Sequence, residues 1–165
     1  MSVPVESLAF RVATLDEIYH LRFAVLRPGM TPERVYFAGD DAPSPAALHF
    51  GAFLVADPRT IVACLTLLES SYENQPAYQL RGMAVDEAYR SRGIGAQLLA
   101  HSEKHIFTHT PVRTLWCNAR VPALNFYLRQ GWSIVSEKFE IPTAGPHRKM
   151  YKGLNGDHFC GTSGT

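Results

Sequence analysis

Apolar residues in the first part of the chain change from strand-like spacing to helix-like spacing. Residues 8–13 are predicted to form a strand, and the apolar positions after them recur at steps of three and four, as on one face of a helix. This helix begins at residues 14–17 (TLDE), which have the form of a capping box: a hydroxyl followed three residues later by a glutamate. Its predicted end is Pro28-Gly29. The pattern therefore predicts a strand followed by an amphipathic helix.

Three apolar runs come next, at residues 47–56, 60–68 and 77–85. Polar turns at 57–59 and 70–76 separate them, which predicts a meander of three strands. Between the first helix and this meander, the segment 30–45 is rich in Pro, Gly and Asp. We expect it to be a loop with one short helix near residues 32–36.

The second half of the chain returns to helical spacing. Its predicted elements are a helix over 93–108, a strand over 113–118, a helix over 122–129, and strands over 132–139 and 147–151 joined by a turn at 142–146. The fold class is therefore α/β (α+β): a mixed, mostly antiparallel sheet of about seven strands with about four helices. We expect a single domain over 1–154 and a flexible tail over 155–165.

The composition is that of an ordinary globular domain. Of the 165 residues, 46% are hydrophobic and 19% are charged, and the formal net charge is +1. This charge gives no reason to expect nucleic acid or an anionic membrane as a partner. The longest apolar stretch, residues 46–56, is too short to span a bilayer, and the first residues do not resemble a signal peptide. The three cysteines (Cys64, Cys117 and Cys160) form no disulfide framework, so we expect a cytoplasmic protein.

The segment 85–96 joins a predicted strand to a predicted helix and carries candidate chemistry. Gly93 and Gly95 let the backbone curve tightly and approach a bulky anion, and the N–H groups that open a helix have no internal partner. Arg90 and Arg92 add positive charge, so the segment could bind a pyrophosphate. It matches neither a P-loop nor a dinucleotide fingerprint, but it does match R-x-x-G-x-G. The alternative is an ordinary strand–helix turn.

Several short segments together resemble the GNAT superfamily of acetyl-CoA-dependent N-acetyltransferases. They are residues 80–86 (LRGMAVD), 89–95 (YRSRGIG), 125–127 (NFY) and 131–132 (GW), in matching order and spacing. Residues 139–150 also resemble the ElaA-like branch of that superfamily.

The resemblance implies a sheet splayed between its fourth and fifth strands, where the pantetheine arm of acetyl-CoA bonds to the fourth strand. The backbone N–H near Met83 would then face the thioester oxygen, as a tetrahedral oxyanion requires. The implied cofactor-binding residues are Met83, Ala84, Val85, Arg90, Ser91, Arg92, Gly93, Ile94, Gly95, Ala96, Asn118 and Asn125. Many members have Asn where this chain has Arg120, so whether Asn118 or Asn125 contacts the pantetheine stays open.

For catalysis, the resemblance implies that Tyr127 faces the sulfur. A thiol pKa of about 8.5 and a phenol pKa of about 10 make full proton transfer from Tyr127 to the thiolate uphill by roughly 2 kcal/mol, which favours a hydrogen bond. Candidate bases for the acceptor amine are Glu69, Glu140, His49 and His147. His147 is the first choice, and its alternative role is to hold the turn at 142–146 by a backbone bond. His101, His105 and His109 share a helix face, which we expect to be solvated rather than a metal site.

The function expected is transfer of the acetyl group of acetyl-CoA to a primary amine in a ternary complex, without a metal. The alternative is a non-catalytic acyl-CoA-binding regulatory or interaction domain. We expect the acceptor pocket between residues 27–45 and residues 140–147, because loops on a rigid scaffold commonly recognise substrates. The acceptor, the size of the acyl group, and the choice between monomer and homodimer are not fixed by these residues.

Overall fold

The computed structural model describes residues 7–26, 37–142 and 144–156. By their internal contacts the residues group into two compact units: unit 1 comprises residues 1–68 and 82–102, and unit 2 comprises residues 69–81 and 103–165. The chain crosses between the units inside β3 (Ile61–Tyr72), β4 (Gln75–Val85) and α2 (Ile94–His109).

The described residues form a mixed sheet of eight strands, mostly antiparallel. Hydrogen-bonded neighbours follow the order β1-β2-β3-β4-β5-β8-β6, with β7 paired to β8. The remaining bounds are β1 Leu8–Ala13, β2 Ala47–Leu54, β5 Thr114–Arg120, β6 Ser133–Ile134, β7 Phe139–Ile141 and β8 Gly145–Gly153. The α-helices of the described residues are α1 (Leu15–Leu26), α2 and α3 (Leu124–Arg129). The predicted fold class is confirmed, while the expected short helix near 32–36 and the helix end at 28–29 lie outside the described residues.

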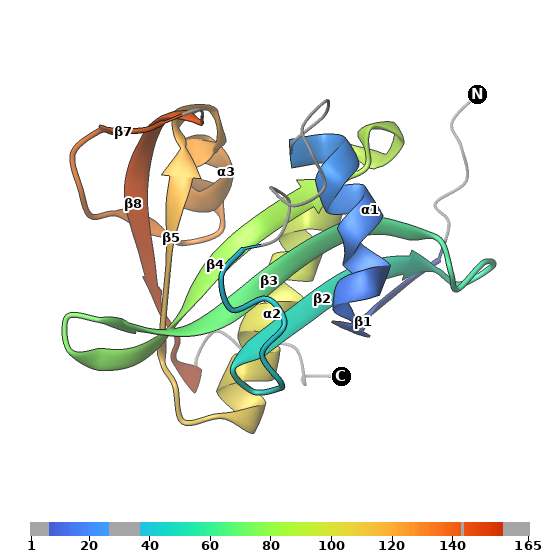
Figure 1. Ribbon diagram of the computed structural model, residues 1–165, viewed down its shortest axis with the longest axis horizontal. Helices are drawn as coiled ribbons and strands as arrows, with labels where there is room; N and C mark the ends of the chain where they lie inside the picture. Colours follow the sequence, from blue (N-terminus) through green and yellow to red (C-terminus); the bar gives the residue numbers. More distant parts are fainter. Residues whose placement is uncertain (1–6, 27–36, 143, 157–165) are drawn as a thin grey trace. The chain divides into compact units, whose positions relative to one another are not determined.

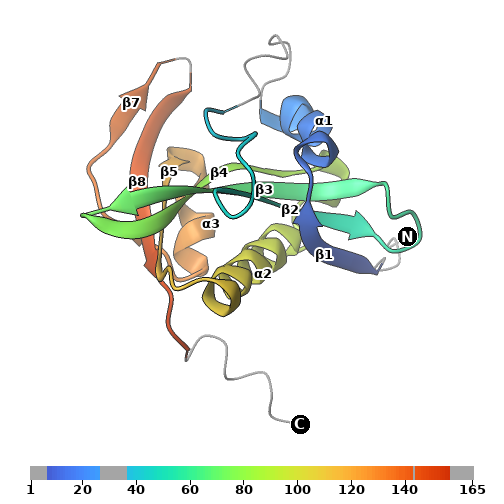
Figure 2. The same cartoon turned by 60° about the horizontal axis from the view of Figure 1, so that its bottom comes forward.

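Unit 1 is built on an antiparallel meander. β1 pairs with β2 along its whole length, and β2 pairs with β3. The capping box at the start of α1 is confirmed: Thr14 N donates to Glu17 Oε1 at 2.9 Å, and Glu17 N donates to Thr14 Oγ1 at 3.2 Å. Within this unit, α1 and the first part of α2 lie on opposite faces of the strands (Figure 2).

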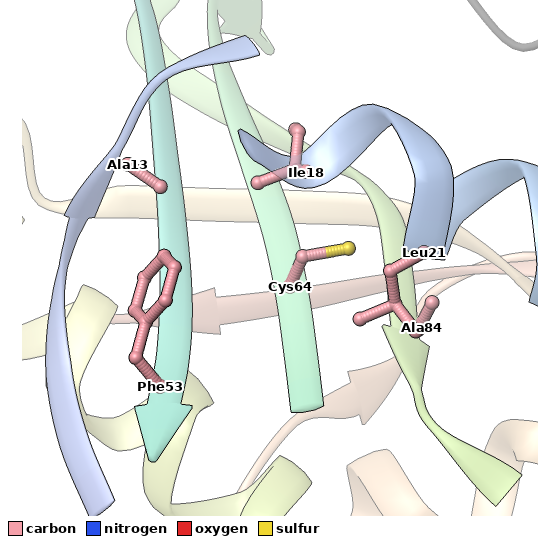
Figure 3. Close-up of a cluster of buried hydrophobic side chains, with 6 residues drawn as sticks. All are labelled: Ala13, Ile18, Leu21, Phe53, Cys64 and Ala84. Carbon is pink, nitrogen blue, oxygen red and sulfur yellow. The ribbon is translucent and has the colours of Figure 1, made fainter. Parts of the chain in front are cut away.

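The core of unit 1 lies between α1 and the strands. Six buried side chains form it: Ala13, Ile18, Leu21, Phe53, Cys64 and Ala84 (Figure 3). They come from one helix and four strands, so the apolar stripe of α1 fixes the helix against the meander. His101 in α2 was predicted to belong to a solvated face. His101 is half-buried, with its ring 6.2 Å from the ring of Phe10 and 6.1 Å from that of Phe50, so the prediction does not hold for this residue, whereas His109 is exposed.

Unit 2 is built on β8, which pairs with β5 on one side and with β6 and β7 on the other. The short helix α3 lies beside β5 (Figure 1). At the end of α3, Lys152 Nζ donates to Gln130 O at 2.8 Å and lies 2.8 Å from Glu103 Oε1. A cation at a helix C-terminus donates to a terminal carbonyl and interacts favourably with the negative end of the helix dipole.

The ladder between β4 and β5 is parallel and short. It pairs Tyr78 with Leu115 and Gln79 with Trp116, although β4 continues to Val85 and β5 to Arg120. A ladder that stops this early agrees with the expected opening of the sheet between its fourth and fifth strands.

Two predicted boundaries are wrong for identifiable reasons. The turn predicted over 70–76 reduces to Glu73-Asn74, whose φ values of 48° and 65° form a tight turn, so β3 and β4 are longer than predicted. The strand predicted over 132–139 is interrupted after Ile134. There the hydroxyl of Ser136 accepts the Lys149 N–H at 2.7 Å, so a side chain replaces a backbone carbonyl in the ladder.

The remaining expectations concern the cysteines, membrane-spanning segments and metal sites. Cys64 and Cys117 are buried free thiols, and Cys160 lies outside the described residues. Within the described ranges, no helix is long and apolar enough to cross a membrane. Nor do those residues contain a group of three or more His, Cys, Asp or Glu side chains placed to hold a metal. The single domain over 1–154 stays a prediction.

Candidate active site

The turn between β4 and α2 is tightly shaped. The Asp86 carboxylate accepts the Ala88 N–H at 2.9 Å and caps the 3-10 helix η2 (Glu87–Tyr89). Ser91 and Gly93 then adopt left-handed backbone conformations, with φ values of 64° and 77°. A Cβ atom added at Gly93 would meet nothing within 4 Å, so the backbone conformation and not a lack of space favours glycine here.

Helix α2 opens directly after this turn. Its first hydrogen bond runs from Gln97 N to Gly93 O at 3.1 Å, so the N–H groups of Ile94, Gly95 and Ala96 precede the bonded part of the helix. The flanking Arg90 and Arg92 are exposed. The helix dipole, the unbonded N–H groups and two exposed cations together make this end of α2 suitable for a phosphate-bearing ligand.

The last residues of β4 lead into the turn. Ala84 points into the core cluster of unit 1 (Figure 3), whereas the side chains of Met83 and Val85 are half-buried and, by strand alternation, belong to the other face. Gly82 interrupts the strand with a φ of 62°. The roles assigned to the backbone of Met83 and Val85 stay predictions.

Tyr127 is buried within unit 2. Its side chain is 8% exposed, and its ring centroid lies 5.4 Å from that of Trp132. Burial raises the pKa of the Tyr127 phenol, and the neighbouring Cys117 raises it further. A raised pKa makes proton transfer from this phenol to a thiolate more unfavourable than for an ordinary tyrosine. The phenol therefore stays protonated and suits a hydrogen-bond donor.

The two candidate asparagines differ in burial. Asn118 is half-buried in β5, and its Oδ1 atom is buried without a hydrogen-bond partner among the described residues. Asn125 is exposed on α3, and Arg120 is exposed at the end of β5. Because a buried acceptor without a partner is costly, Asn118 has the stronger need for a donor.

His147 makes a hydrogen bond to the backbone of the preceding turn, as its alternative, structural role requires. Its side chain is 4% exposed, its Nδ1 lies 2.8 Å from Gly145 O, and its ring lies 6.2 Å from that of Phe139. Since Gly145 O can only accept, Nδ1 carries the proton. His147 thus holds the turn that precedes it, and its role as a base stays a prediction.

The other candidate bases lie in two different environments. Glu69 and Glu140 are exposed. His49 is buried, with Nδ1 2.8 Å from Thr66 Oγ1 and Nε2 2.9 Å from Asp40 O. With both nitrogens engaged and its pKa lowered by burial, His49 is a structural group in this arrangement.

Sequence reasoning missed a buried charge next to His49. Arg22 is 1% exposed and lies 2.6 Å from Asp40 Oδ2. The signal was present, because Arg22 stands four residues after Ile18 and four before Leu26, on the apolar stripe of α1. A charged residue on such a stripe requires a buried partner.

The described part of the predicted acceptor loop lines a cleft in unit 1. The cleft has a volume of about 400 Å³, and its walls are Leu15, Phe37, Ala38, Gly39, Asp40 and Asp41. The candidate residues as a whole are divided between the units. Those from Met83 to Ala96 belong to unit 1, and Asn118, Asn125, Tyr127 and His147 belong to unit 2.

Comparison with known proteins gives one consistent family. The family model described as an acetyltransferase (GNAT) domain matches residues 49–134. YitI of Bacillus subtilis (strain 168), named as an uncharacterized N-acetyltransferase, is 32% identical over 147 residues, which cover 89% of this chain and 97% of YitI. Both matches include the turn at residues 90–96.

Solved structures share the fold at lower identity. ElaA of Escherichia coli has a TM-score of 0.72 at 21% identity, covering 88% of this chain and 99% of that chain. NAA60 of Arabidopsis thaliana, solved in complex with acetyl-CoA, has a TM-score of 0.70 at 14% identity, covering 91% and 100%. The likeness to ElaA agrees with the resemblance of residues 139–150. Sequence, fold and the turn before α2 therefore agree, and the chain belongs to the GNAT acetyltransferase family.

Proposed function

We propose that the protein transfers the acetyl group of acetyl-CoA to a primary amine, by direct attack of the amine in a ternary complex. The observation that carries this proposal is the turn at residues 90–96, where left-handed Ser91 and Gly93 lead into the open N-terminus of α2. In a chain of the GNAT family, such a turn suits the pyrophosphate of CoA. The buried free thiols Cys64 and Cys117 agree with a cytoplasmic location.

The acetyl-CoA arm would use backbone groups in unit 1. The N–H groups of Ile94, Gly95 and Ala96 would bind the pyrophosphate, with Arg90 and Arg92 adding charge. The backbone of Met83 and Val85 would bond to the pantetheine, and the Met83 N–H would face the thioester oxygen. From unit 2, Asn118 Oδ1 would accept a pantetheine N–H, which supplies the donor that this buried oxygen lacks among the described residues.

The reaction forms a C–N bond and breaks a C–S bond. The neutral amine attacks the thioester carbonyl and forms a tetrahedral oxyanion with a cationic nitrogen. This nitrogen loses a proton to a base or to water, and the intermediate collapses to an amide while CoA leaves as a thiolate. A lysine-like amine has a pKa near ~10.4, so it must first lose a proton to a base or to water. The thiolate finally takes a proton from solvent, and Tyr127 donates a hydrogen bond to the sulfur as its charge develops.

Binding at the turn is tested by calorimetry with CoA on Gly93→Glu. The matched control is Gly145→Glu, because Gly145 also has a positive φ, 87°, and also leaves a Cβ without neighbours within 4 Å. We expect Gly93→Glu to abolish measurable binding and Gly145→Glu to retain the wild-type affinity. Equal affinity in all three proteins would remove the turn from the CoA site.

Turnover is tested with a panel of amine acceptors and acetyl-CoA, read by release of free thiol. Tyr127→Phe should lower kcat by roughly 10²-fold, the low end for general-acid assistance, and leave acetyl-CoA affinity unchanged. Tyr78→Phe removes another buried phenol hydroxyl and serves as the control. Tight CoA binding without turnover of any acceptor would favour the non-catalytic alternative.

A further inference from the structure

Four residues of unit 1, from α1, the loop before β2, β2 and β3, form a closed ring of hydrogen bonds. Arg22 donates from Nη1 to Asp40 Oδ2 and from Nη2 to Thr66 Oγ1, both at 2.6 Å. His49 joins the other two members: its Nε2 lies 2.9 Å from Asp40 O and its Nδ1 lies 2.8 Å from Thr66 Oγ1. Because Asp40 O can only accept, a neutral His49 carries its proton on Nε2, and Thr66 donates to Nδ1.

The ring holds the guanidinium group of Arg22 in a fixed orientation. Two of its nitrogens are bonded to partners on different segments, and its central carbon lies 4.6 Å from the centroid of the Phe37 ring. Asp40 is itself held, since Oδ2 also accepts the Phe37 N–H at 2.6 Å. A lysine has one nitrogen in place of this planar fork, so it could not reproduce the arrangement.

Arg22 lies directly against the backbone of Gly82 in β4. A Cβ atom at Gly82 would be 2.7 Å from Arg22 Nε and 3.0 Å from a carbon of the Phe37 ring. The Gly82 carbonyl also accepts from Cys64 Sγ at 3.7 Å, and burial raises the pKa of this thiol to about 12, so it keeps its proton. With a φ of 62°, Gly82 is thus restricted by its conformation, by the guanidinium and by the thiol.

We propose that Arg22, held by Asp40 and Thr66, is a positioning residue that fixes the Gly82 backbone and so sets the direction of the neighbouring Met83 N–H toward the thioester oxygen. The inference rests on the proposed function, which assigns that N–H to acetyl-CoA. A buried ion pair adds little stability over apolar packing, whereas a displacement of about 1 Å at a reacting centre costs on the order of 10² in rate. Positioning is therefore the benefit that this ring can provide.

The test reads the Met83 N–H directly and needs no acceptor. The chain has four methionines, so ¹⁵N-methionine labelling gives a few amide resonances, and Met83→Leu assigns the one from residue 83. In the wild type, acetyl-CoA should shift the Met83 resonance well beyond the shift caused by CoA, which lacks the thioester carbonyl. In Arg22→Lys, CoA should bind with the wild-type affinity while this difference between the two ligands disappears.

Two further variants complete the experiment. Thr66→Val removes the ring contacts to Arg22 and His49, and it stands in for Arg22→Lys if that variant does not fold. Arg11→Lys, an exposed arginine that contacts Glu17, is the control and should keep the full difference. A folded ring variant with a lower melting temperature and an unchanged acetyl-CoA difference would show that the ring is structural only. Failure of the wild type to bind CoA would instead overturn the proposed function, and this role with it.

Discussion

An arginine pairs with a carboxylate near each end of α1, and the two pairs differ in burial although they share one distance. Arg11 lies 2.6 Å from Glu17 with side chains 44% and 32% exposed, and Arg22 lies 2.6 Å from Asp40 with side chains 1% and 2% exposed. At the exposed pair, water and salt can replace either partner. At the buried pair water cannot replace either partner, so an atom without a partner in the protein stays unsatisfied, as Asp40 Oδ1 does among the described residues. The N–O distance of 2.6 Å, which the two pairs share, therefore does not show how much either pair contributes to stability or to function.

The largest expected effect is the removal of one buried partner. Asp40→Ala leaves the guanidinium of Arg22 buried without its counterion and should lower the free energy of unfolding by about 3–5 kcal/mol. Urea unfolding measures the change. Asp41→Ala, at the exposed neighbour, should stay within about 0.5 kcal/mol of the wild type. An equally small effect for Asp40→Ala would show that burial does not distinguish the pairs.

Removal of a neutral ring member should cost less. Thr66→Val keeps the shape of the side chain but deprives Arg22 Nη2 of its acceptor and His49 Nδ1 of its donor. We expect a loss of about 1–3 kcal/mol in the free energy of unfolding. Thr66→Ser retains the hydroxyl and should recover most of that loss. If Thr66→Ser is as unstable as Thr66→Val, packing of the methyl group and not the ring accounts for the cost.

The ring should also make stability depend on pH through His49. Burial and the charge of Arg22 lower the pKa of His49 below 6.5, and the contact with Asp40 opposes this only in part. The unfolded chain then binds more protons than the folded one, so stability is full above pH 6.5 and falls as the pH drops below it. Urea midpoints for the wild type and His49→Gln between pH 5 and 8 measure this, and parallel curves would contradict it.

The smallest effect is expected at the exposed pair. Glu17→Gln keeps the capping bond to Thr14 but loses the charge that faces Arg11 and the Oε2 atom that accepts from the Arg11 guanidinium. The pair is exposed, so the loss should be at most about 1 kcal/mol and should shrink in high salt. The Arg11 guanidinium lowers the pKa of Glu17 to about 2, so this contribution is present above pH 4.5 and declines below it. A loss as large as that of Asp40→Ala would abolish the contrast between the pairs.

The sequence predicted the elements of the fold well because their signals are local. The strand at 8–13 and the reciprocal bonds of Thr14 and Glu17 depend only on neighbouring residues. The strand over 132–139 was wrong because its interruption depends on Ser136, which bonds to Lys149 thirteen residues away. The apolar pattern of residues 132–139 cannot reveal that the Ser136 hydroxyl, and not a backbone carbonyl, accepts the N–H of Lys149.

The candidate site also has parts that depend on neighbouring residues and parts that depend on residues distant in the sequence. The turn before α2 could be predicted in part, because Gly93 has the positive φ that only glycine adopts readily. The positive φ of Ser91 was not predicted, and Gly95, which was expected to curve the backbone, lies within α2 without a positive φ. The ring around Arg22 could not be predicted, because its members come from α1, the loop before β2, β2 itself and β3. Only the position of Arg22 on an apolar stripe pointed to a partner, and nothing in the pattern identified that partner as Asp40.

The way in which the chain crosses between the units has a consequence for its synthesis on the ribosome. Every segment of unit 1 has been made once residue 102 is added, whereas the hairpin at residues 69–81 belongs to unit 2 and its partner strand β5 begins only at Thr114. At about 5–20 residues per second, Tyr78 and Gln79 wait for some seconds before Leu115 and Trp116 of β5 exist to pair with them. All of unit 1 therefore exists on the nascent chain while this hairpin still lacks its partner strand.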